Sequence, residues 1–284
     1  MEINIASQRV WMITGASRGF GAKIVAAALA AGDAVVATAR NPQSLAEEFG
    51  GHANLLAVAL DVTDGQQAIT AAQAAVDRFG RIDILVNNAG YGLLGAVEEA
   101  SNEEVKHQFD TNVFGVLNVT RAVLPYMRAR RAGHIINISS IGGYYAYAGW
   151  GVYGATKFAV EGLTEGLAQE LAPLGIYATV VEPGFFRTDF LEGNSLVETK
   201  NRIGDYAATV GEMRSFASKV NGQQPGDPDK LATAFIKLGH TAKPPVRLPL
   251  GTDTISRIAE KHAYVNEELQ QWKTVAASTD FSAA

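Results

Sequence analysis

The sequence predicts an α/β fold, in which a doubly wound parallel sheet of about seven strands has helices on both faces. Short apolar runs alternate along the chain with longer amphipathic segments. The runs lack the polar alternation of a strand with one wet face, so both faces are expected to be buried, as in a parallel sheet between helices. The first run leads through a glycine-rich turn into an alanine-rich segment, which is the order strand, loop and helix.

The apolar runs are expected to form strands joined by right-handed crossovers. They are Val10–Thr14, Ala34–Thr38, Asn54–Leu60, Ile82–Val86, His134–Ser139, Ile176–Val181 and Val246–Leu250. Gly32 and Gly80 favour helix ends, and Pro125 favours a bend in a long helix. The expected helices are Gly21–Ala31, Gln43–Phe49, Asp64–Phe79, Glu103–Arg131, Val152–Leu171, Asp227–Leu238 and Thr252–Trp272.

The segment from Phe185 to about residue 225 interrupts this rhythm, because it is polar and poorly periodic. Such irregular segments in compact domains are typical of lids or binding elements. The stretch Thr274–Ala284 is expected to be a frayed tail. Without repeats or linkers, we expect one domain over residues 1–284, with a substrate-binding insert at about 185–225 and a C-terminal extension at about 252–284.

The composition excludes several classes of function. The 284 residues include no cysteine, which excludes disulfides, thiolate catalysis and cysteine metal sites. A formal net charge of −5 gives no reason to expect binding to nucleic acid or to an anionic membrane. Met1–Arg9 lacks the features of a signal peptide, and the apolar stretch Ile24–Ala39 is too short to span a bilayer. We therefore expect a cytoplasmic protein that binds neither nucleic acid nor membrane.

A glycine-rich loop follows the first expected strand. In Thr14–Gly21 the glycines Gly15, Gly19 and Gly21 permit a tight turn and close approach of the backbone to a ligand. The exposed N–H groups at the start of the next helix favour a phosphate. A tight turn without a ligand is the simpler alternative, but the position between strand and helix predicts a Rossmann-type dinucleotide site.

The end of the second expected strand favours NADP(H) over NAD(H). An acidic residue holds the ribose 2′-hydroxyl in NAD-preferring folds of this kind, whereas here Ala39 occupies that place and Arg40 follows. A guanidinium can hold a 2′-phosphate, and Arg18 in the glycine loop is a second candidate. Either arginine could instead be an ordinary solvated side chain.

Tyr153 and Lys157 are the candidate catalytic pair. They lie four residues apart in an expected helix, so they share a face. A nearby ammonium is expected to lower a tyrosine pKa from its usual value of about 10, which suits a general acid. The hydroxyl of Ser140, at the end of an expected strand, could hold the proton acceptor. A half-buried tyrosine beside a solvated lysine is the alternative.

Taken together, the motifs from about Val10 to Thr188 resemble the short-chain dehydrogenase/reductase family. The resemblance rests on the Thr-Gly-x-x-x-Gly-x-Gly loop, Asn87–Gly90, Asn112 in Asp-Thr-Asn-Val-Phe-Gly, Ser140 in Asn-Ile-Ser-Ser-Ile-Gly-Gly, the Tyr-x-x-x-Lys pair and Pro183–Thr188. It implies that Tyr153 exchanges a proton with the substrate oxygen and that Ser140 hydrogen-bonds that oxygen. It also implies that Lys157 binds the nicotinamide ribose and that Asn112 holds a water linking Lys157 to solvent. Ser139 competes for the serine role, and the family spacing to the tyrosine favours Ser140.

The resemblance implies a cofactor cleft lined from several loops. The expected cofactor-binding residues are Gly15, Ser17, Arg18, Gly19, Phe20, Gly21, Arg40, Asp61, Val62, Asn88, Ala89, Gly90, Tyr153, Lys157, Pro183, Gly184, Phe186 and Thr188. The family also implies a homo-oligomer, dimer or tetramer, built on the helix of Tyr153 and the one spanning 110–131. Gly154, Gly162 and Gly166 within the first of these helices favour close approach of the cofactor or a second subunit.

The substrate side is rich in aromatic residues, which predicts a mostly apolar pocket. They are Tyr91, Tyr144, Tyr145, Tyr147, Trp150, Phe185, Phe186 and Phe190, of which several are expected to line the pocket and others to be ordinary core. We expect a small hydrophobic ketone or aldehyde and its alcohol as substrates. No metal site is expected, and His107 and His134 are interpreted as structural.

Two other functions use the same residues. One is a non-catalytic NADP(H)-sensing protein, which the complete Ser–Tyr–Lys set disfavours. The other is a 3-oxoacyl-carrier reductase, which would need a basic patch for its acidic carrier. The insert offers Arg187, Lys200, Arg202, Arg214 and Lys219, but they are interspersed with acids.

Overall fold

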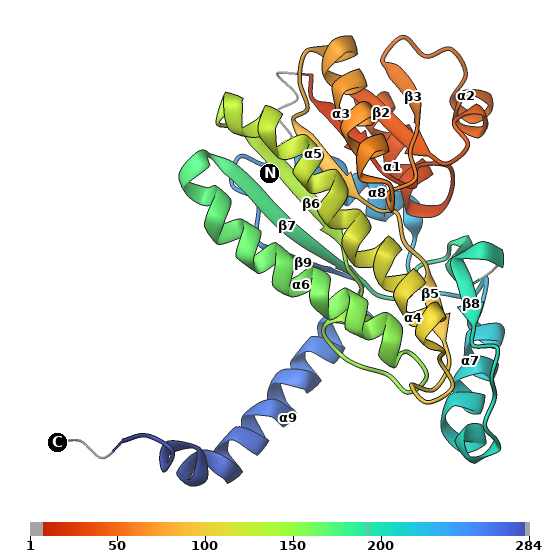
Figure 1. The fold of residues 1–284 in the computed structure, drawn as a ribbon, viewed down its shortest axis with the longest axis vertical. Helices are drawn as coiled ribbons and strands as arrows, with labels where there is room; N and C mark the ends of the chain where they lie inside the picture. Colours follow the sequence, from red (N-terminus) through yellow and green to blue (C-terminus); the bar gives the residue numbers. More distant parts are fainter. Residues whose placement is uncertain (1–7, 192, 282–284) are drawn as a thin grey trace.

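A computed structural model describes residues 8–191 and 193–281 of the chain, and its centre is a seven-stranded sheet (Figure 1). The strand order is β3-β2-β1-β4-β6-β7-β9, and all six neighbouring pairs are parallel. The strands are β1 Val10–Ile13, β2 Ala34–Ala39, β3 Leu55–Ala59, β4 Ile84–Asn87, β6 Gly133–Ile138, β7 Ile176–Pro183 and β9 Arg247–Leu250. Each corresponds to one predicted apolar run, so the predicted doubly wound parallel sheet is confirmed.

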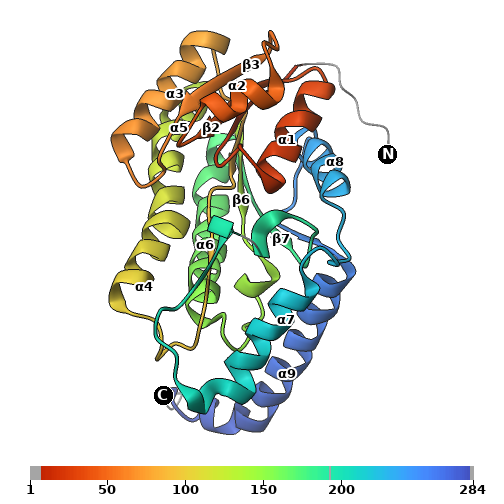
Figure 2. The same cartoon turned by 90° about the vertical axis from the view of Figure 1, so that its right-hand side faces the viewer.

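Helices cover both faces of the sheet (Figure 2). Neighbouring residues of β1 pack into the cores on opposite faces. Trp11 and Ile13 pack with α1 Gly19–Ala30 and α8 Pro228–Gly239. Met12 packs on the other face, in the same cluster as α3 Gly65–Phe79 and α5 Gly115–Arg130. The long α6, Gly151–Leu171, lies beside α5, and the short α2 is Gln43–Phe49. Side chains alternate along a strand, so a run that is apolar at every position fills both cores.

The strand order reverses at β1, which lies between β2 and β4. The carboxyl ends of β1 and β4 therefore open onto a crevice, the place where open α/β sheets bind ligands. The glycine loop follows β1 and the Asn88 loop follows β4. Topology alone thus brings these two motifs to one edge of the sheet.

The helix expected over Glu103–Arg131 is divided into three pieces. They are α4 Asn102–Phe109, a π-helical turn η1 at Asp110–Phe114, and α5 with Pro125 inside it. Ser101 and Glu104 form a reciprocal capping box at the start of α4. Wider π turns are frequent at functional sites, and this one carries Asn112.

The segment after β7 is more ordered than the sequence predicts. It contains a short strand, β8 Leu196–Glu198, and a helix, α7 Glu212–Val220. β8 pairs in parallel with β5 Gly92–Leu94, and neither strand is among the predicted ones. Both strands have three residues, and their pairing joins segments far apart in sequence, so neither has a periodic signal of its own.

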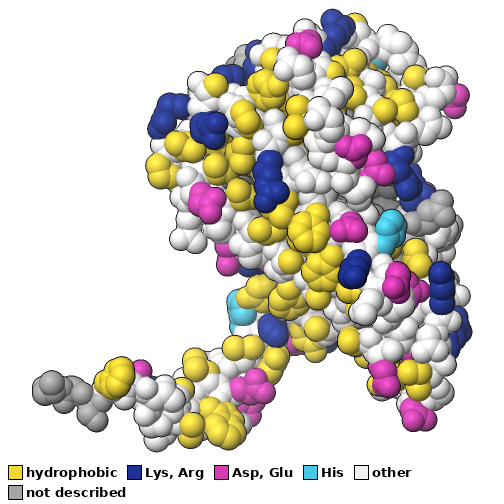
Figure 3. Space-filling model, viewed as in Figure 1, with side chains coloured by type: hydrophobic (Ala, Val, Ile, Leu, Met, Phe, Trp, Pro, Cys, Tyr) yellow, Lys and Arg dark blue, Asp and Glu magenta, His cyan; other side chains and the backbone are white. Residues whose placement is uncertain are grey.

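The C-terminal helix α9 runs from Thr252 to Ala277, past its predicted end at Trp272. Figure 1 shows it leading away from the sheet, and Figure 3 shows hydrophobic side chains on it. Leu269 and Trp272 are 57% and 64% exposed. The helix therefore includes the first residues of the expected frayed tail, Thr274–Ala277. Residues 282–284 of that tail lie outside the described part of the chain. Residues 1–7, on which the expected lack of a signal peptide rests, also lie outside it. No helix among the described residues is both long and apolar enough to cross a membrane.

Candidate active site

Hydrogen bonds in both directions hold the glycine loop against the loop that contains Asn88. The Thr14 hydroxyl oxygen accepts from the backbone N–H groups of Asn88 and Ala89, both at 3.0 Å. The Asn88 side-chain amide donates to the carbonyls of Thr14 and Gly15, both at 2.9 Å. Thr14 and Asn88 therefore set the shape of the loop as well as its place.

Glycine is required sterically at two positions of this loop. Gly15 has a φ of 61°, and a Cβ there would lie 2.9 Å from the Cα of Ala89. A Cβ on Gly21 would collide with the carbonyl oxygen of Gly15. The backbone can make this turn only if these two positions carry no side chain, and α1 then begins at Gly19, at the end of the loop.

A cavity of about 790 Å³ lies at this edge of the sheet. Most of the residues expected at the cofactor line it: Gly15, Ser17, Arg18, Gly19, Phe20, Arg40, Asp61, Val62, Asn88, Ala89, Gly90, Tyr153, Lys157 and Thr188. Pro183, Gly184 and Phe186 line a second, adjoining cavity instead. Gly21 lines neither cavity and acts through the packing of the loop.

Ala39 and Arg40 end the second strand at the cavity, as expected. Ala39 is buried in its wall, and the Arg40 side chain is exposed at its rim. Neither Arg18 nor Arg40 makes a side-chain hydrogen bond or ion pair with any residue that the structure describes. Asn41 and Ser44 also line this rim, and sequence reasoning missed them. The sequence feature that could have identified them is the pair of polar side chains that follows Arg40 at the start of α2.

Tyr153 and Lys157 lie on one face of α6, and both are buried. The Lys157 ammonium donates to the Ile138 carbonyl at 2.8 Å and lies 5.7 Å from the centre of the Tyr153 ring. The Ser140 hydroxyl accepts from the backbone N–H of Gly142 at 3.1 Å. Ser140 follows β6, so the strand end and the helix bring the three side chains together.

The expected lowering of the Tyr153 pKa is wrong for this structure. Burial raises the pKa of Tyr153 to about 12, and a hydrogen bond with Ser140 only partly opposes this. Burial also lowers the pKa of Lys157 to about 8, with the charge of Glu161 acting in the opposite direction. Sequence spacing places the ammonium near the ring but does not reveal that its hydrogen bond goes to a carbonyl, nor that the pair is desolvated.

The two serines point to different sides of their strand end, as alternation predicts. Ser139 is buried, and a Cβ on Gly143 would meet its hydroxyl together with the carboxylate of Glu161. Ser140 instead lies near the Tyr153 ring, since a Cβ on Gly142 would meet both. Ser140 is thus the serine on the tyrosine side.

Within the π-helical turn, three hydrogen bonds to two residues fix the side chain of Asn112. Its amide donates to the Tyr91 carbonyl at 2.9 Å and to the Thr156 hydroxyl at 3.1 Å, while its oxygen accepts from the Tyr91 N–H at 3.1 Å. It lines neither cavity, but a Cβ on Gly90 would contact both its oxygen and the Lys157 ammonium. Thr156, which the sequence did not single out, thus links Asn112 to α6, the helix of Tyr153 and Lys157.

The adjoining cavity has a volume of about 390 Å³ and mostly apolar walls. Of the expected aromatic residues, Tyr147, Trp150, Phe185, Phe186 and Phe190 line it. Ser140 and Tyr153 line it as well. Tyr91 lines the larger cavity, and Tyr144 and Tyr145 are turned toward His262 and Arg257 of α9. Several of the listed aromatic residues thus line one apolar cavity, as predicted, and the other three lie elsewhere.

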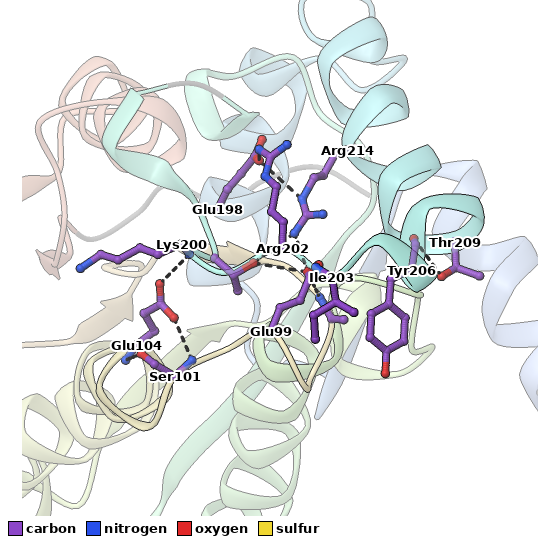
Figure 4. Close-up of polar contacts among 12 residues, drawn as sticks. Glu99, Ser101, Glu104, Glu198, Lys200, Arg202, Ile203, Tyr206, Thr209 and Arg214 are labelled. Carbon is purple, nitrogen blue, oxygen red and sulfur yellow. Dashed lines mark hydrogen bonds and ion pairs between the residues drawn. The ribbon is translucent and has the colours of Figure 1, made fainter.

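Several basic residues of the insert form hydrogen bonds or ion pairs with acidic residues (Figure 4). Arg214 donates to the buried Glu99 at 2.6 Å, and Arg202 donates to Glu198 at 2.5 Å. The Lys200 backbone donates to Glu104, which draws the insert onto the start of α4. These contacts order the segment rather than offering a free basic patch.

The histidines have local partners. His134 is buried, its ring lies 2.8 Å from the Thr179 hydroxyl, and burial lowers its pKa to about 3. The His107 ring packs against Tyr91, with ring centres 5.7 Å apart. Over residues 8–191 and 193–281, no group of three or more His, Cys, Asp or Glu side chains is arranged to hold a metal ion.

Comparison with known proteins agrees with this geometry. A family model described as short chain dehydrogenase matches residues 9–198. The chain is 40% identical over 266 residues to the 3-ketodihydrosphingosine reductase of Bacteroides thetaiotaomicron, and the match covers 93% of this chain and 96% of that protein. A solved short-chain dehydrogenase from Streptomyces avermitilis has a TM-score of 0.89 and 42% identity, covering 97% of this chain and 100% of that one. The solved structure of ElxO with NADP bound has a TM-score of 0.73 and 28% identity, covering 88% and 100%. This chain belongs to the short-chain dehydrogenase family.

Proposed function

We propose that this protein is an NADP(H)-dependent oxidoreductase that interconverts a hydrophobic ketone or aldehyde and the corresponding alcohol. One observation carries the proposal: Tyr153 lines both the cavity at the glycine loop and the smaller apolar cavity. A group at that boundary can exchange a proton with a substrate whose carbon meets a cofactor from the other side. The similarity to a 3-ketodihydrosphingosine reductase supports a carbonyl as the reacting group.

The residues of the larger cavity fit a dinucleotide phosphate. Gly15 lines this cavity, and Gly21 allows the tight packing of the loop that forms one of its walls, as in dinucleotide-binding loops. Arg18 and Arg40 are cations without partners in the described residues, beside Asn41 and Ser44. We assign the 2′-phosphate to this rim, which favours NADP(H), and ElxO, with NADP in its solved structure, is a precedent in the family.

Each catalytic side chain has a separate task. Tyr153 gives a proton to the carbonyl oxygen during reduction and takes it back during oxidation. Ser140 holds that oxygen, and Lys157 holds the ribose of the cofactor. Asn112, fixed by Tyr91 and Thr156, positions the water through which Lys157 communicates with solvent. When bound, NADP(H) supplies or accepts the hydride, and the protein provides position and charge.

We further propose that the chain is one domain and forms a homo-oligomer through α5 and α6. Phe158 on α6 and Phe114 beside α5 are 42% and 53% exposed. Gly162 and Gly166 have open space over their Cα atoms, so a second backbone could approach there. Gly154 has a different reason, since a Cβ there would lie 3.2 Å from the Gly142 carbonyl oxygen.

The test is a panel of ketones and aldehydes followed by NADPH absorbance, with NADPH binding measured separately by fluorescence titration. Turnover of apolar ketones is the expected result. Binding without turnover of any carbonyl compound would instead support a sensing protein. Turnover restricted to carrier-bound 3-oxoacyl groups would support a carrier reductase, against which the paired arginines of the insert argue.

A further inference from the structure

Gln224 is a buried polar residue in the wall of the smaller cavity. Its side chain is 1% exposed, and it lies in the segment between α7 and α8. Neither its amide nitrogen nor its carbonyl oxygen has a hydrogen-bond partner among the residues that the structure describes. Buried amide groups are nearly always hydrogen-bonded, because leaving them without partners is costly. A group that is kept in this condition points to a ligand.

The backbone around Gln224 is firmly held. Gly226 forms a parallel bridge with Phe186, and its N–H donates to the Phe185 carbonyl at 2.9 Å. The Arg187 guanidinium donates to the backbone carbonyl of Gln224 at 3.3 Å. The residue is therefore fixed to the segment that follows β7, and the absence of side-chain partners does not reflect a loose surface loop.

Three other polar side chains of the cavity already have hydrogen-bond partners. Asp253 accepts from the Phe185 N–H at 2.7 Å, and Thr188 accepts from the Phe190 N–H at 3.3 Å. Arg257 donates to Glu260 at 2.6 Å. Gln224 is the residue in this wall whose two polar side-chain atoms both lack a partner among the described residues. The buried Ser139 hydroxyl, at the end of β6, is a further group in the wall without a hydrogen-bond partner among them.

We propose that the Gln224 carboxamide binds a neutral polar group of the substrate, a hydroxyl or an amide, at a point away from the reacting carbonyl. A carboxamide both donates and accepts hydrogen bonds, so it suits a substrate group that also does both. Because it is uncharged, it would not repel a charged group or the apolar atoms elsewhere in the cavity. The substrate class is then a hydrophobic ketone or aldehyde with one hydroxyl or amide substituent. This inference rests on the proposed oxidoreductase function.

The cofactor carries a carboxamide too, so the same chemistry has a second source. Pro183, Gly184 and Thr188, the residues expected near that carboxamide, line the same cavity as Gln224. Gln224 does not line the larger cavity where the rest of the cofactor is expected. We therefore assign the contact to the substrate, and the test separates the two sources.

The test compares Gln224→Met with the wild type and with Gln223→Met, a matched change at an exposed neighbour. The probes are 2-alkanones and acetophenones in pairs, one member with a hydroxyl or acetamido group where the other has a methyl. In the wild type, at least one polar member should have the higher kcat/KM. Gln224→Met should reduce that preference about tenfold, the effect of one lost hydrogen bond, and Gln223→Met should leave it unchanged.

Two binding and stability measurements complete the experiment. NADPH affinity, from fluorescence titration, should be the same in all three proteins, and Gln224→Met should melt at the same or a higher temperature because it removes an amide without partners. An unchanged preference, a loss of NADPH affinity in Gln224→Met, or a clear fall in its Tm would each overturn the proposal. Failure of the oxidoreductase function would look different, because no ketone of either kind would then be turned over.

Discussion

Arg247 on β9 donates a hydrogen bond to Glu161 at 2.5 Å, one helical turn beyond Lys157 on α6. The same guanidinium binds Glu182 at 2.5 Å and Glu165 at 2.6 Å. One cation thus contacts three carboxyl side chains, and two of these, Glu161 and Glu165, belong to α6 itself. Burial raises the pKa of Glu161 to about 8, and the charge of Glu182 adds to the increase, while Ser139 and Arg247 oppose it.

The raised Glu161 pKa predicts that stability falls with pH. Between the ordinary pKa of 4.5 and about 8, the folded protein keeps a proton that the unfolded chain has released, so stability decreases as pH rises through this range. Glu161→Gln should lack that decrease. Glu165→Gln, at the exposed partner, should keep it. Urea denaturation at several pH values measures the effect, and parallel curves for wild type and Glu161→Gln would contradict it.

Tyr153→Phe removes the proposed proton donor and leaves the ring in place. We expect turnover to fall by about 10² to 10⁴ with NADPH affinity unchanged, because general acid catalysis contributes that much and the phenol lies at the edge of the cofactor cavity. Tyr144→Phe, the same change at a residue that lines neither cavity, should turn over normally. Steady-state kinetics and fluorescence titration provide the readouts, and a Tyr153→Phe variant with near-normal turnover would refute the mechanism.

Arg40→Asp places a carboxylate where we assign the 2′-phosphate. The ratio of kcat/KM for NADPH to that for NADH should fall by at least about tenfold, since an attraction is replaced by a repulsion. Arg128→Asp makes the same charge change at an exposed position on α5, away from both cavities, and should leave the ratio unchanged. An unaltered ratio in Arg40→Asp would remove the assigned contact.

Arg214→Met leaves the carboxylate of Glu99 buried without its cation. The unfolding free energy should fall by about 3 kcal/mol, as for other broken buried ion pairs. The double variant with Glu99→Gln should recover part of this loss, because no bare charge then remains. Denaturation curves of the four proteins form the cycle. NADPH affinity should change less than the KM for ketones, since the pair orders α7 and the insert.

Phe158→Glu introduces a charge on the exposed face of α6. If a second copy covers this face, the variant should have a smaller mass than the wild type in light scattering after size exclusion, since a buried lone charge disfavours association. Ile69→Glu, at a similarly exposed position on α3, should keep the wild-type mass. Equal masses for all three proteins would place any oligomer interface elsewhere.

Local signals in the sequence predict the strands of the central sheet correctly. The seven apolar runs became the seven strands, because burial on both faces leaves no polar position along them. Prediction failed where two distant segments define an element together, as in the pairing of β5 with β8. The end of α9 was placed too early, because helical periodicity weakens in a helix that packs on little.

For the candidate site, too, some features follow from the sequence alone and others depend on the tertiary structure. Spacing alone placed Tyr153 and Lys157 on one helical face and Ser140 at a strand end, and the glycine pattern located the cavity for the cofactor. Tertiary structure decided what no spacing reveals. It determined that Tyr153 has a raised pKa, that Lys157 donates to the Ile138 carbonyl, and that Gln224 is buried in the wall of the smaller cavity. The physical reason is that residue types and periods are written along the chain, whereas desolvation and hydrogen-bond partners depend on which segments surround a group after folding.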